Sequence, residues 1–353
     1  MASTALKALT AACLLSFFPA GARAQNYPAP KQGDWTARDF RFHTGEVMPE
    51  LRLHYTAIGD PRNDAVAIMH GTGGSGGNFL NKDYAGELFG PGQPLDASKY
   101  YIVLPDSIGA GKSSKPSDGL RAAFPRYNYD DLVEAQYLLL SQGLGIKHLR
   151  LATGNSMGGM ETWIFGERHP DYMDALAPMA SSPTEMSARN WMMRRMLIES
   201  IKADPAWNNG DYSAQPAALK LASVWFGVGT SGGSRGYQTL APTREAADKL
   251  IDARLAAPGG DANDTIYQFE ASRDYNPAPG LEGIHAALLA VNSADDERNP
   301  VELGLMDEAL KRVPGAQFHL IPASAETRGH GTTGMARLWK QPFADFLRAA
   351  PRK

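Results

Sequence analysis

A single serine stands between glycines in the segment Gly154-Asn155-Ser156-Met157-Gly158, which fits the pattern G-x-S-x-G. The apolar run HLRLAT precedes it, and the helical pattern GMETWIFGE follows it. A strand, a tight turn and a helix in this order lift a serine hydroxyl clear of a sheet, where it can attack an acyl carbon. The motif alone is weak evidence, since about 0.2 matches per chain arise by chance, but its position makes Ser156 the candidate nucleophile. Gly154 and Gly158 are expected where a Cβ would collide between strand and helix.

His330 is the candidate base. A serine hydroxyl is a poor nucleophile near neutral pH and needs a base, and the chain has eight histidines. His330 lies in RGHGTTG, a glycine-flanked segment between the last predicted strand and the closing helix. Other histidines are expected at structural positions: His43 and His54 in the N-terminal strands, His148 and His319 in or beside later strands, His169 at a helix end and His285 before a strand.

The imidazole needs a carboxylate to orient it. Where the serine stands on such a strand–turn–helix, the acid lies between the serine and the histidine in the chain. The apolar run AALLAVN leads into SADDERNP. Asp296, four residues before Pro300, is the predicted acid. Asp295 is the alternative that a shift of one residue would select, and it is otherwise expected to be a turn or capping residue.

The oxygen that becomes negative during acyl transfer needs backbone N–H donors. Met157, which follows the nucleophile, supplies the first. The second is expected from HGTGGSGG, residues 70–77, after the apolar run AVAIMH. Thr72 is the predicted donor and Gly73 the alternative. A nucleotide-binding loop is not expected, because the Gly-Lys-Ser at residues 111–113 has Asp106, five residues before Gly111, where the other glycine of the motif would stand.

Short apolar runs alternate with helical patterns, which predicts an α/β fold: a mostly parallel central sheet with helices on both faces. Amphipathic helices are expected over 129–143 and 160–169. Strands are expected over 51–57, 65–70, 100–104, 148–153, 175–180, 286–292 and 317–322.

The alternation of strand and helix patterns is interrupted over residues 183–279. There, helical patterns rich in Trp, Met and Arg indicate an inserted helical cap. The core is therefore predicted over 25–182 and 280–353. Trp191, Trp207 and Trp225 either line a pocket in the cap or pack its helices together.

Residues 1–24 have the composition of a signal peptide. The apolar segment ALTAACLLSFF is too short to cross a bilayer, and Ala22-Arg23-Ala24 fits the A-x-A cleavage pattern. Cleavage is expected before Gln25, with export to a periplasm or beyond; a retained anchor is the alternative.

The only cysteine, Cys13, falls inside that leader, so the mature chain would contain no disulfide and no thiolate metal site. Loss of Lys7 and Arg23, with no acid, changes the formal net charge from −3 to −5. This mild acidity without basic clusters argues against nucleic acid and anionic lipid as partners, and no other stretch is apolar enough to span a membrane.

Together these residues resemble the α/β-hydrolase superfamily from about Leu51 onward. GNSMGGM around Ser156, and DPAWNNGDY at residues 204–212, resemble more narrowly the homoserine O-acetyltransferase branch, whose second motif is DP-x-W-x-x-G-x-Y. The resemblance implies the α/β-hydrolase fold and an acyl-serine intermediate, from which the acyl group passes to an alcohol or to water.

Three features favour water as the second nucleophile. An exported enzyme would not meet acetyl-CoA, the donor that these transferases use. DSIGAGKSSKPSDG, residues 106–119, departs from the Gly-Ser/Thr-x-Gly-Pro pattern of the transferases. Ile198 stands where an arginine is expected six residues before Asp204, although Arg194, one helical turn away, can take its place.

The sequence therefore predicts an exported serine hydrolase that cleaves a carboxylic ester, or a related acyl bond, of a small molecule. Ser156, Asp296 and His330 form the predicted catalytic triad, and the N–H groups of Thr72 and Met157 the predicted oxyanion hole. No cofactor or metal is required, and a homodimer is compatible with the sequence. The alternatives are an O-acyltransferase of the homoserine O-acetyltransferase type and a non-catalytic binding protein on a hydrolase scaffold.

Overall fold

The structure is a computed structural model that describes residues 26–353. The expected signal peptide and its cleavage site lie outside the described residues.

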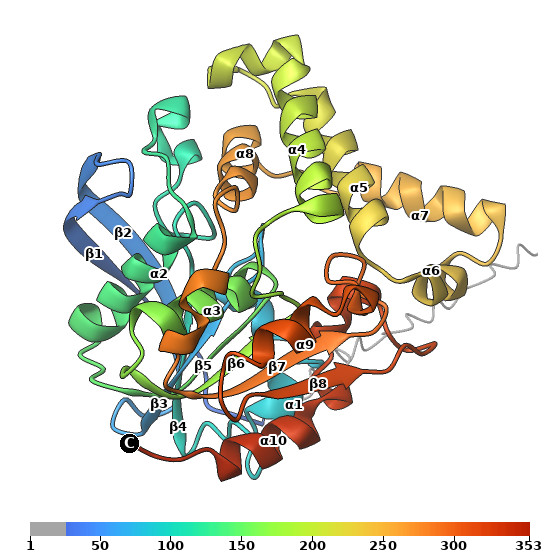
Figure 1. Ribbon diagram of the computed structural model, residues 1–353. Coiled ribbons are helices and arrows are strands. Elements are labelled where there is room, and N and C mark those ends of the chain that lie inside the picture. Colours follow the sequence, from blue (N-terminus) through green and yellow to red (C-terminus); the bar gives the residue numbers. More distant parts are fainter. Residues whose placement is uncertain (1–25) are drawn as a thin grey trace, which may run out of the picture.

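An eight-stranded sheet of order β1-β2-β4-β3-β5-β6-β7-β8 forms the centre of the molecule (Figure 1). The pairs β1–β2 and β2–β4 are antiparallel, and every other pair is parallel. The predicted α/β-hydrolase fold class is confirmed. The strands are β1 (Lys31–Arg41), β2 (Val47–Ile58), β3 (Asp64–Met69), β4 (Tyr100–Pro105), β5 (Leu149–Asn155), β6 (Met173–Met179), β7 (Ala287–Ser293) and β8 (Gln317–Ile321).

The inner strands are mostly apolar and almost wholly buried because helices cover both faces of the sheet. In β3, Ala67 and Met69 face one hydrophobic cluster while Val66 and Ile68 face the other. Residues of α2, α3 and α9 belong to the first cluster, and residues of α1 and α10 to the second. These helices are α1 (Ala85–Leu88), α2 (Tyr129–Leu138), α3 (Met157–Arg168), α9 (Leu305–Leu310) and α10 (Lys340–Ala349).

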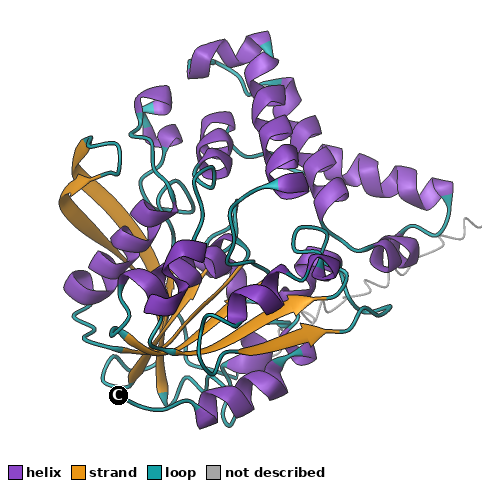
Figure 2. Cartoon of the chain, viewed as in Figure 1, coloured by secondary structure: helices purple, strands orange, loops and turns teal. Residues whose placement is uncertain are grey.

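All seven predicted strands form, and β1 is an eighth that the apolar pattern does not reveal. Figure 2 shows β1 and β2 as a ribbon that extends from one edge of the sheet. Most side chains of β1 are exposed or half-buried, so its sequence KQGDWTARDFR carries no continuous apolar run. The helix expected over 129–143 is α-helical only to Leu138, after which residues 139–143 form a wider turn.

Between β6 and β7 the described chain forms helices and no strand. Figure 1 shows these helices grouped above the sheet. Three of them share a hydrophobic cluster of their own, built on Leu197, Ile198, Phe226 and Ile266. The cap boundaries at 183 and 279 stay a prediction. The helices are α4 (Ala188–Ala203), α5 (Ala217–Thr230), α6 (Ser234–Leu240), α7 (Arg244–Ala256) and α8 (Ala262–Glu270).

The DPAWNNGDY motif holds this helical segment together. The Asp204 carboxylate accepts the N–H of Ala218 at 3.0 Å, at the start of α5. Trp207 Nε1 donates to Asn263 Oδ1 of α8 at 3.0 Å. The motif is therefore a structural brace between α4, α5 and α8.

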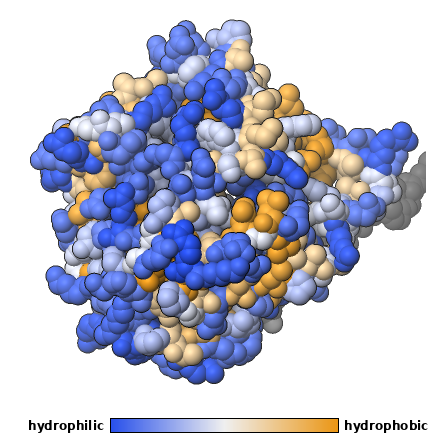
Figure 3. All heavy atoms as spheres, viewed as in Figure 1, coloured by the Kyte–Doolittle hydropathy of each residue, from blue (hydrophilic) through white to orange (hydrophobic). Residues whose placement is uncertain are grey.

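The three tryptophans of this segment have different environments. Trp191 and Trp207 are half-buried and pack against neighbouring clusters, as the packing alternative predicts. Trp225 of α5 is 68% exposed, so it does not serve as a packing residue. Figure 3 shows apolar side chains gathered over this part of the surface. Among residues 26–353, no helix combines the length and apolarity needed to cross a membrane.

Candidate active site

Ser156 lies at the sharp turn between β5 and α3. Its backbone has φ 59° and ψ −114°, a conformation that is strained for a residue with a side chain. A Cβ on Gly154 would lie 2.5 Å from the backbone of Gly158, and one on Gly158 would lie 2.1 Å from the carbonyl oxygen of Met69. Glycine is thus required at both positions, as the sequence predicts, and the turn aims the hydroxyl away from the sheet.

The structure brings Ser156, His330 and Asp296 together. His330 Nε2 lies 2.8 Å from Ser156 Oγ, and His330 Nδ1 lies 3.0 Å from both carboxylate oxygens of Asp296. Asp296 follows β7, and His330 follows the neighbouring β8, so both loops begin at the same edge of the sheet. With Nδ1–H donating to Asp296, the lone pair of Nε2 is available to accept the serine proton.

Burial and charge tune these groups for proton transfer. Burial lowers the pKa of His330, and the positive charges of Arg298 and Arg194 lower it further, while Asp296 opposes them. Burial alone would raise the pKa of Asp296, but the charge and hydrogen bond of His330, with hydrogen bonds from Asn299 and the N–H of Arg298, hold it below its usual value. Near neutral pH this pairs a neutral imidazole with an ionised carboxylate.

The backbone N–H groups of Met157 and Thr72 remain the predicted oxyanion donors, and both residues lie close to Ser156. Met157 is the first residue of α3, where N–H groups have no partner within the helix. A Cβ on Gly71 would lie 3.4 Å from Ser156 Cβ, so the turn that contains Thr72 lies against the nucleophile. The alternative donor, Gly73, already donates its N–H to Gln268 Oε1 of α8 at 2.7 Å. The geometry therefore favours Thr72.

The loop that carries Asp296, residues 294–300 (the acid loop), contains supporting residues that sequence reasoning missed. Asn299 Nδ2 donates to Asp296 Oδ2 at 2.9 Å. Glu297 Oε2 accepts the N–H of His330 at 3.3 Å. Asp295 accepts from the hydroxyl of Thr327 at 2.7 Å, so it binds the backbone turn before His330 and not the imidazole. The segment SADDERNP gave the signal for the acid, and the tertiary contacts show the separate partners of Asp295, Asp296 and Glu297.

A buried arginine adds positive charge beside the site. Arg194 of α4 is fully buried, and it donates to two neutral side chains, Asn190 at 3.0 Å and Ser272 at 3.2 Å. Its Nη2 is buried and has no partner among the described residues, and the same holds for Tyr129 Oη and Thr72 Oγ1. The charge of Arg194 acts on the pKa of both Tyr129 and His330. These unpaired groups can therefore bind a polar or anionic part of a substrate.

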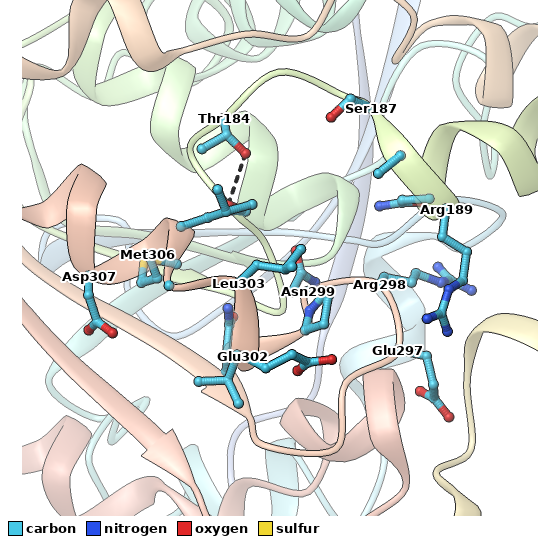
Figure 4. Close-up of a pocket in the computed structure, with 18 of the residues that line it drawn as sticks. Thr184, Ser187, Arg189, Glu297, Arg298, Asn299, Glu302, Leu303, Met306 and Asp307 are labelled. Atoms are coloured by element: carbon cyan, nitrogen blue, oxygen red, sulfur yellow. Dashed lines mark hydrogen bonds between the residues drawn. The ribbon is translucent and has the colours of Figure 1, made fainter.

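A cavity of about 230 Å³ lies on the other side of the acid loop (Figure 4). Glu297, Arg298 and Asn299 line it from the acid loop, Leu303 from the turn that follows, and Met306 from α9. Ser156 and His330 are not among the residues that line it. Both are only 8% exposed, so the reacting groups themselves are enclosed.

The other histidines have structural contacts. His43 was expected in a strand but lies in the turn after β1, where Nδ1 contacts Asp131 at 2.6 Å. His70 accepts the N–H of Ser107 on Nε2 at 3.0 Å and so supports the oxyanion turn. No group of three or more His, Cys, Asp or Glu side chains within residues 26–353 is arranged to hold a metal ion.

Comparison with known proteins identifies the family. The α/β-hydrolase fold family matches residues 64–235. The homoserine O-acetyltransferase of Haloarcula marismortui is 32% identical, and the match covers 71% of this chain and 73% of the relative. The chain belongs to the homoserine O-acetyltransferase-like branch of the α/β-hydrolase superfamily.

Solved structures share the fold of this superfamily member. An acetylester hydrolase from Corynebacterium glutamicum has a TM-score of 0.78 and 21% identity, covering 90% of this chain and 96% of that one. A homoserine O-acetyltransferase from Bacillus anthracis also has a TM-score of 0.78, with 19% identity, covering 92% and 99%. The same α/β-hydrolase fold thus carries two named activities, and the fold alone does not choose between them.

Proposed function

We propose that the protein is an acyl-transferring enzyme that forms an ester on Ser156 and passes the acyl group to an alcohol that carries a negative charge. The observation that carries the proposal is the 2.8 Å contact between Ser156 Oγ and His330 Nε2, beside the two backbone donors. The curated relatives support acyl transfer, the alternative of the sequence analysis, better than the ester hydrolysis that it put first.

The first half-reaction places the acyl group on the enzyme. His330 Nε2 removes the proton from Ser156 Oγ as the oxygen forms a bond to the acyl carbonyl carbon. The carbonyl oxygen becomes negative and is bound by the N–H groups of Thr72 and Met157. When the carbonyl re-forms, the bond to the leaving group breaks, and His330 gives its proton to that group.

The second half-reaction releases the acyl group. His330 removes a proton from the incoming hydroxyl, whose oxygen attacks the acyl carbon. The ester bond to Ser156 then breaks, and the proton returns to Ser156 Oγ. An alcohol gives a new ester, whereas water gives a free acid, so the same residues serve both reactions.

Arg194 supports a charged acceptor. Its guanidinium is fully buried and bound only to neutral side chains, and a buried charge is stabilised by an opposite charge. A carboxylate on the acceptor alcohol would supply that charge. Arg194 then performs the role that the family resemblance expects from an arginine at position 198.

Ester hydrolysis is the second candidate, and Ile198 favours it. This residue is fully buried in the apolar cluster of the helical segment, so no charged group can act from the position where the resemblance expects one. If the mature protein is exported, acetyl-CoA is absent from its surroundings, which also favours water.

The deciding experiment uses protein that begins at Gln25. Release of p-nitrophenol from p-nitrophenyl acetate is measured with ethanol, with homoserine, and without an added alcohol, and the O-acetyl product is identified by mass spectrometry. We expect turnover that homoserine accelerates more than ethanol does, and no turnover in Ser156→Ala. A matched pair tests the charge: Arg194→Met should raise the KM for the carboxylate-bearing alcohol about tenfold or more. Arg195→Met, an exposed neighbour that pairs with Glu199, should leave it unchanged.

The other outcomes identify the competing functions. Turnover that no alcohol changes would make the protein an ester hydrolase. A wild-type protein that neither turns over esters nor reacts with a fluorophosphonate, a serine-directed reagent, would leave the binding-protein alternative.

A further inference from the structure

The turn between α5 and α6, residues 230–233 (the corner), is bound to the acid loop. Glu297 Oε1 accepts the N–H of Gly233 at 2.7 Å. Arg298 Nε donates to the carbonyl and the hydroxyl oxygens of Thr230, both at 3.1 Å. The guanidinium of Arg298 also lies 4.6 Å from the ring centroid of Phe226 in α5. Two successive residues of the acid loop thus bind the helical segment.

The same two residues bind the triad. The second carboxylate oxygen of Glu297 accepts the N–H of His330 at 3.3 Å. The backbone N–H of Arg298 donates to Asp296 Oδ1 at 2.8 Å. Glu297 and Arg298 therefore each bind the corner and also bind a member of the triad.

The corner and the segment before His330 also touch directly. Gly232 donates its N–H to the carbonyl of Arg328 at 3.1 Å. Gly233 and Gly329 have φ of 67° and 54°. A Cβ on Gly329 would lie 2.2 Å from the Glu297 carboxylate and 2.7 Å from the nitrogen of Gly233. The two backbones are packed so closely that a displacement of the corner displaces the backbone of His330.

We propose that the corner positions the His330 imidazole for proton transfer, with Glu297 and Arg298 as the positioning residues. The helical segment then acts on the chemical step, in addition to any role in choosing substrates. The inference rests on the proposed acyl-serine chemistry. A misplacement of about 1 Å at a reacting group can cost up to about a hundredfold in rate. The hydrogen bonds of Glu297 to His330 and of Arg298 to Asp296 can therefore affect kcat strongly.

The experiment weakens each contact without removing a reacting group. Glu297→Gln keeps the shape of the side chain but presents an amide NH2 to one of the two backbone donors. Thr230→Val removes one acceptor of Arg298 and keeps the volume. Each has a matched control: Glu302→Gln in the turn after the acid loop, and Thr239→Val in α6, whose hydroxyl bonds only the carbonyl of Arg235.

We expect Glu297→Gln to lower kcat about tenfold and to slow fluorophosphonate labelling by the same factor, with the KM of the acyl donor within about twofold of wild type. Thr230→Val should lower kcat about threefold. Both changes act on the same connection between the corner and the triad. The kcat of the double variant should therefore fall by less than the product of the two single-variant factors. Both controls should match wild type.

Thermal unfolding identifies any variant that does not fold. If Glu297→Gln does not fold, Thr230→Val still tests the inference. An active wild type whose kcat is unchanged in both variants would overturn this inference and leave the proposed function intact. A rise in KM without a change in kcat would also overturn the inference. So would a double variant whose kcat falls by the full product of the two single-variant factors. A wild type that is inert to esters and to the fluorophosphonate would overturn the proposed function, and this inference with it.

Discussion

The hydroxyl oxygen of Ser156 and the Nε2 atom of His330 are 2.8 Å apart, although 174 residues separate them in the chain. Ser156 is held by the turn between β5 and α3, and His330 by the loop after β8, three strands away in the sheet. A contact between such distant parts requires that the parallel strands from β5 to β8 are in register. The distance between Ser156 Oγ and His330 Nε2 is therefore sensitive to how these strands pack.

Asp296→Asn should lower kcat by about 10³ to 10⁴ while the protein stays folded. The amide NH2 of asparagine can donate a hydrogen bond to His330 Nδ1, which favours the tautomer with a proton on Nε2, and that nitrogen can no longer accept from Ser156. Steady-state kinetics on p-nitrophenyl acetate measure the loss, and Asp307→Asn, an exposed change in α9, is the control. A loss of less than tenfold would contradict the role of Asp296.

The acid limb of the pH profile should have its midpoint below pH 6.5. His330 acts as a base only when neutral, and burial lowers its pKa from the ordinary 6.5, with Arg298 and Arg194 adding to the effect. Activity should therefore rise with pH through that lowered pKa and level off above it. The dependence of kcat/KM on pH from 4.5 to 8 gives the midpoint. Arg194→Met removes a positive charge and should move the midpoint upward; a midpoint above 6.5 in the wild type would contradict this account.

Glu161→Gln should make stability less dependent on pH. Glu161 is fully buried in α3, and burial raises its pKa from 4.5 to about 8, against hydrogen bonds from Gln136 and Ser107 that lower it. Between these values the folded protein keeps a proton that the unfolded chain releases. Stability of the wild type should therefore fall as pH rises through this window, by up to about 1.4 kcal/mol per pH unit.

Glutamine mimics the protonated acid and should remove the part of that fall that Glu161 contributes. Urea unfolding at pH 5, 6 and 7 gives the free energies, and Glu245→Gln on the exposed face of α7 is the control. Parallel curves for the wild type and Glu161→Gln would show that the buried acid does not titrate in this range.

Two glycine-to-alanine changes in helices should have opposite effects on stability. A Cβ on Gly158 would lie 2.1 Å from the carbonyl oxygen of Met69, so Gly158→Ala should cost about 3 kcal/mol or more. Gly227 in α5 has nothing within 4 Å of the added atom, and Gly227→Ala should stabilise by about 0.5–1 kcal/mol. Denaturant midpoints of the two variants test both signs, and a neutral Gly158→Ala would mean that α3 and β3 are not so closely packed.

The residues that could be predicted from the sequence share one property: each lies in the turn or loop that follows a strand of the parallel sheet. Ser156, Asp296 and His330 all stand in the loop or turn after such a strand, and the parallel arrangement brings those ends to one edge. Local pattern and topology were sufficient to select them.

The residues that could not be predicted act through contacts with no local pattern. Glu297 binds Gly233, 64 positions away, and Gln268 binds Gly73, 195 positions away. Strand β1 was missed because it has only one close neighbour, β2, and keeps most of its side chains in water. Apolar periodicity predicts elements that bury one face against a core. It therefore cannot predict exposed two-stranded ribbons or hydrogen bonds between loops.

The order of the strands also has a consequence for the newly made chain. A ribosome completes Ser156 and its turn long before it reaches Asp296 and His330, and β8 is an edge strand that pairs only with β7. Until β8 has been synthesised and has joined the sheet, the serine has no base. The growing polypeptide therefore carries a nucleophile without its base until nearly the whole chain has been made.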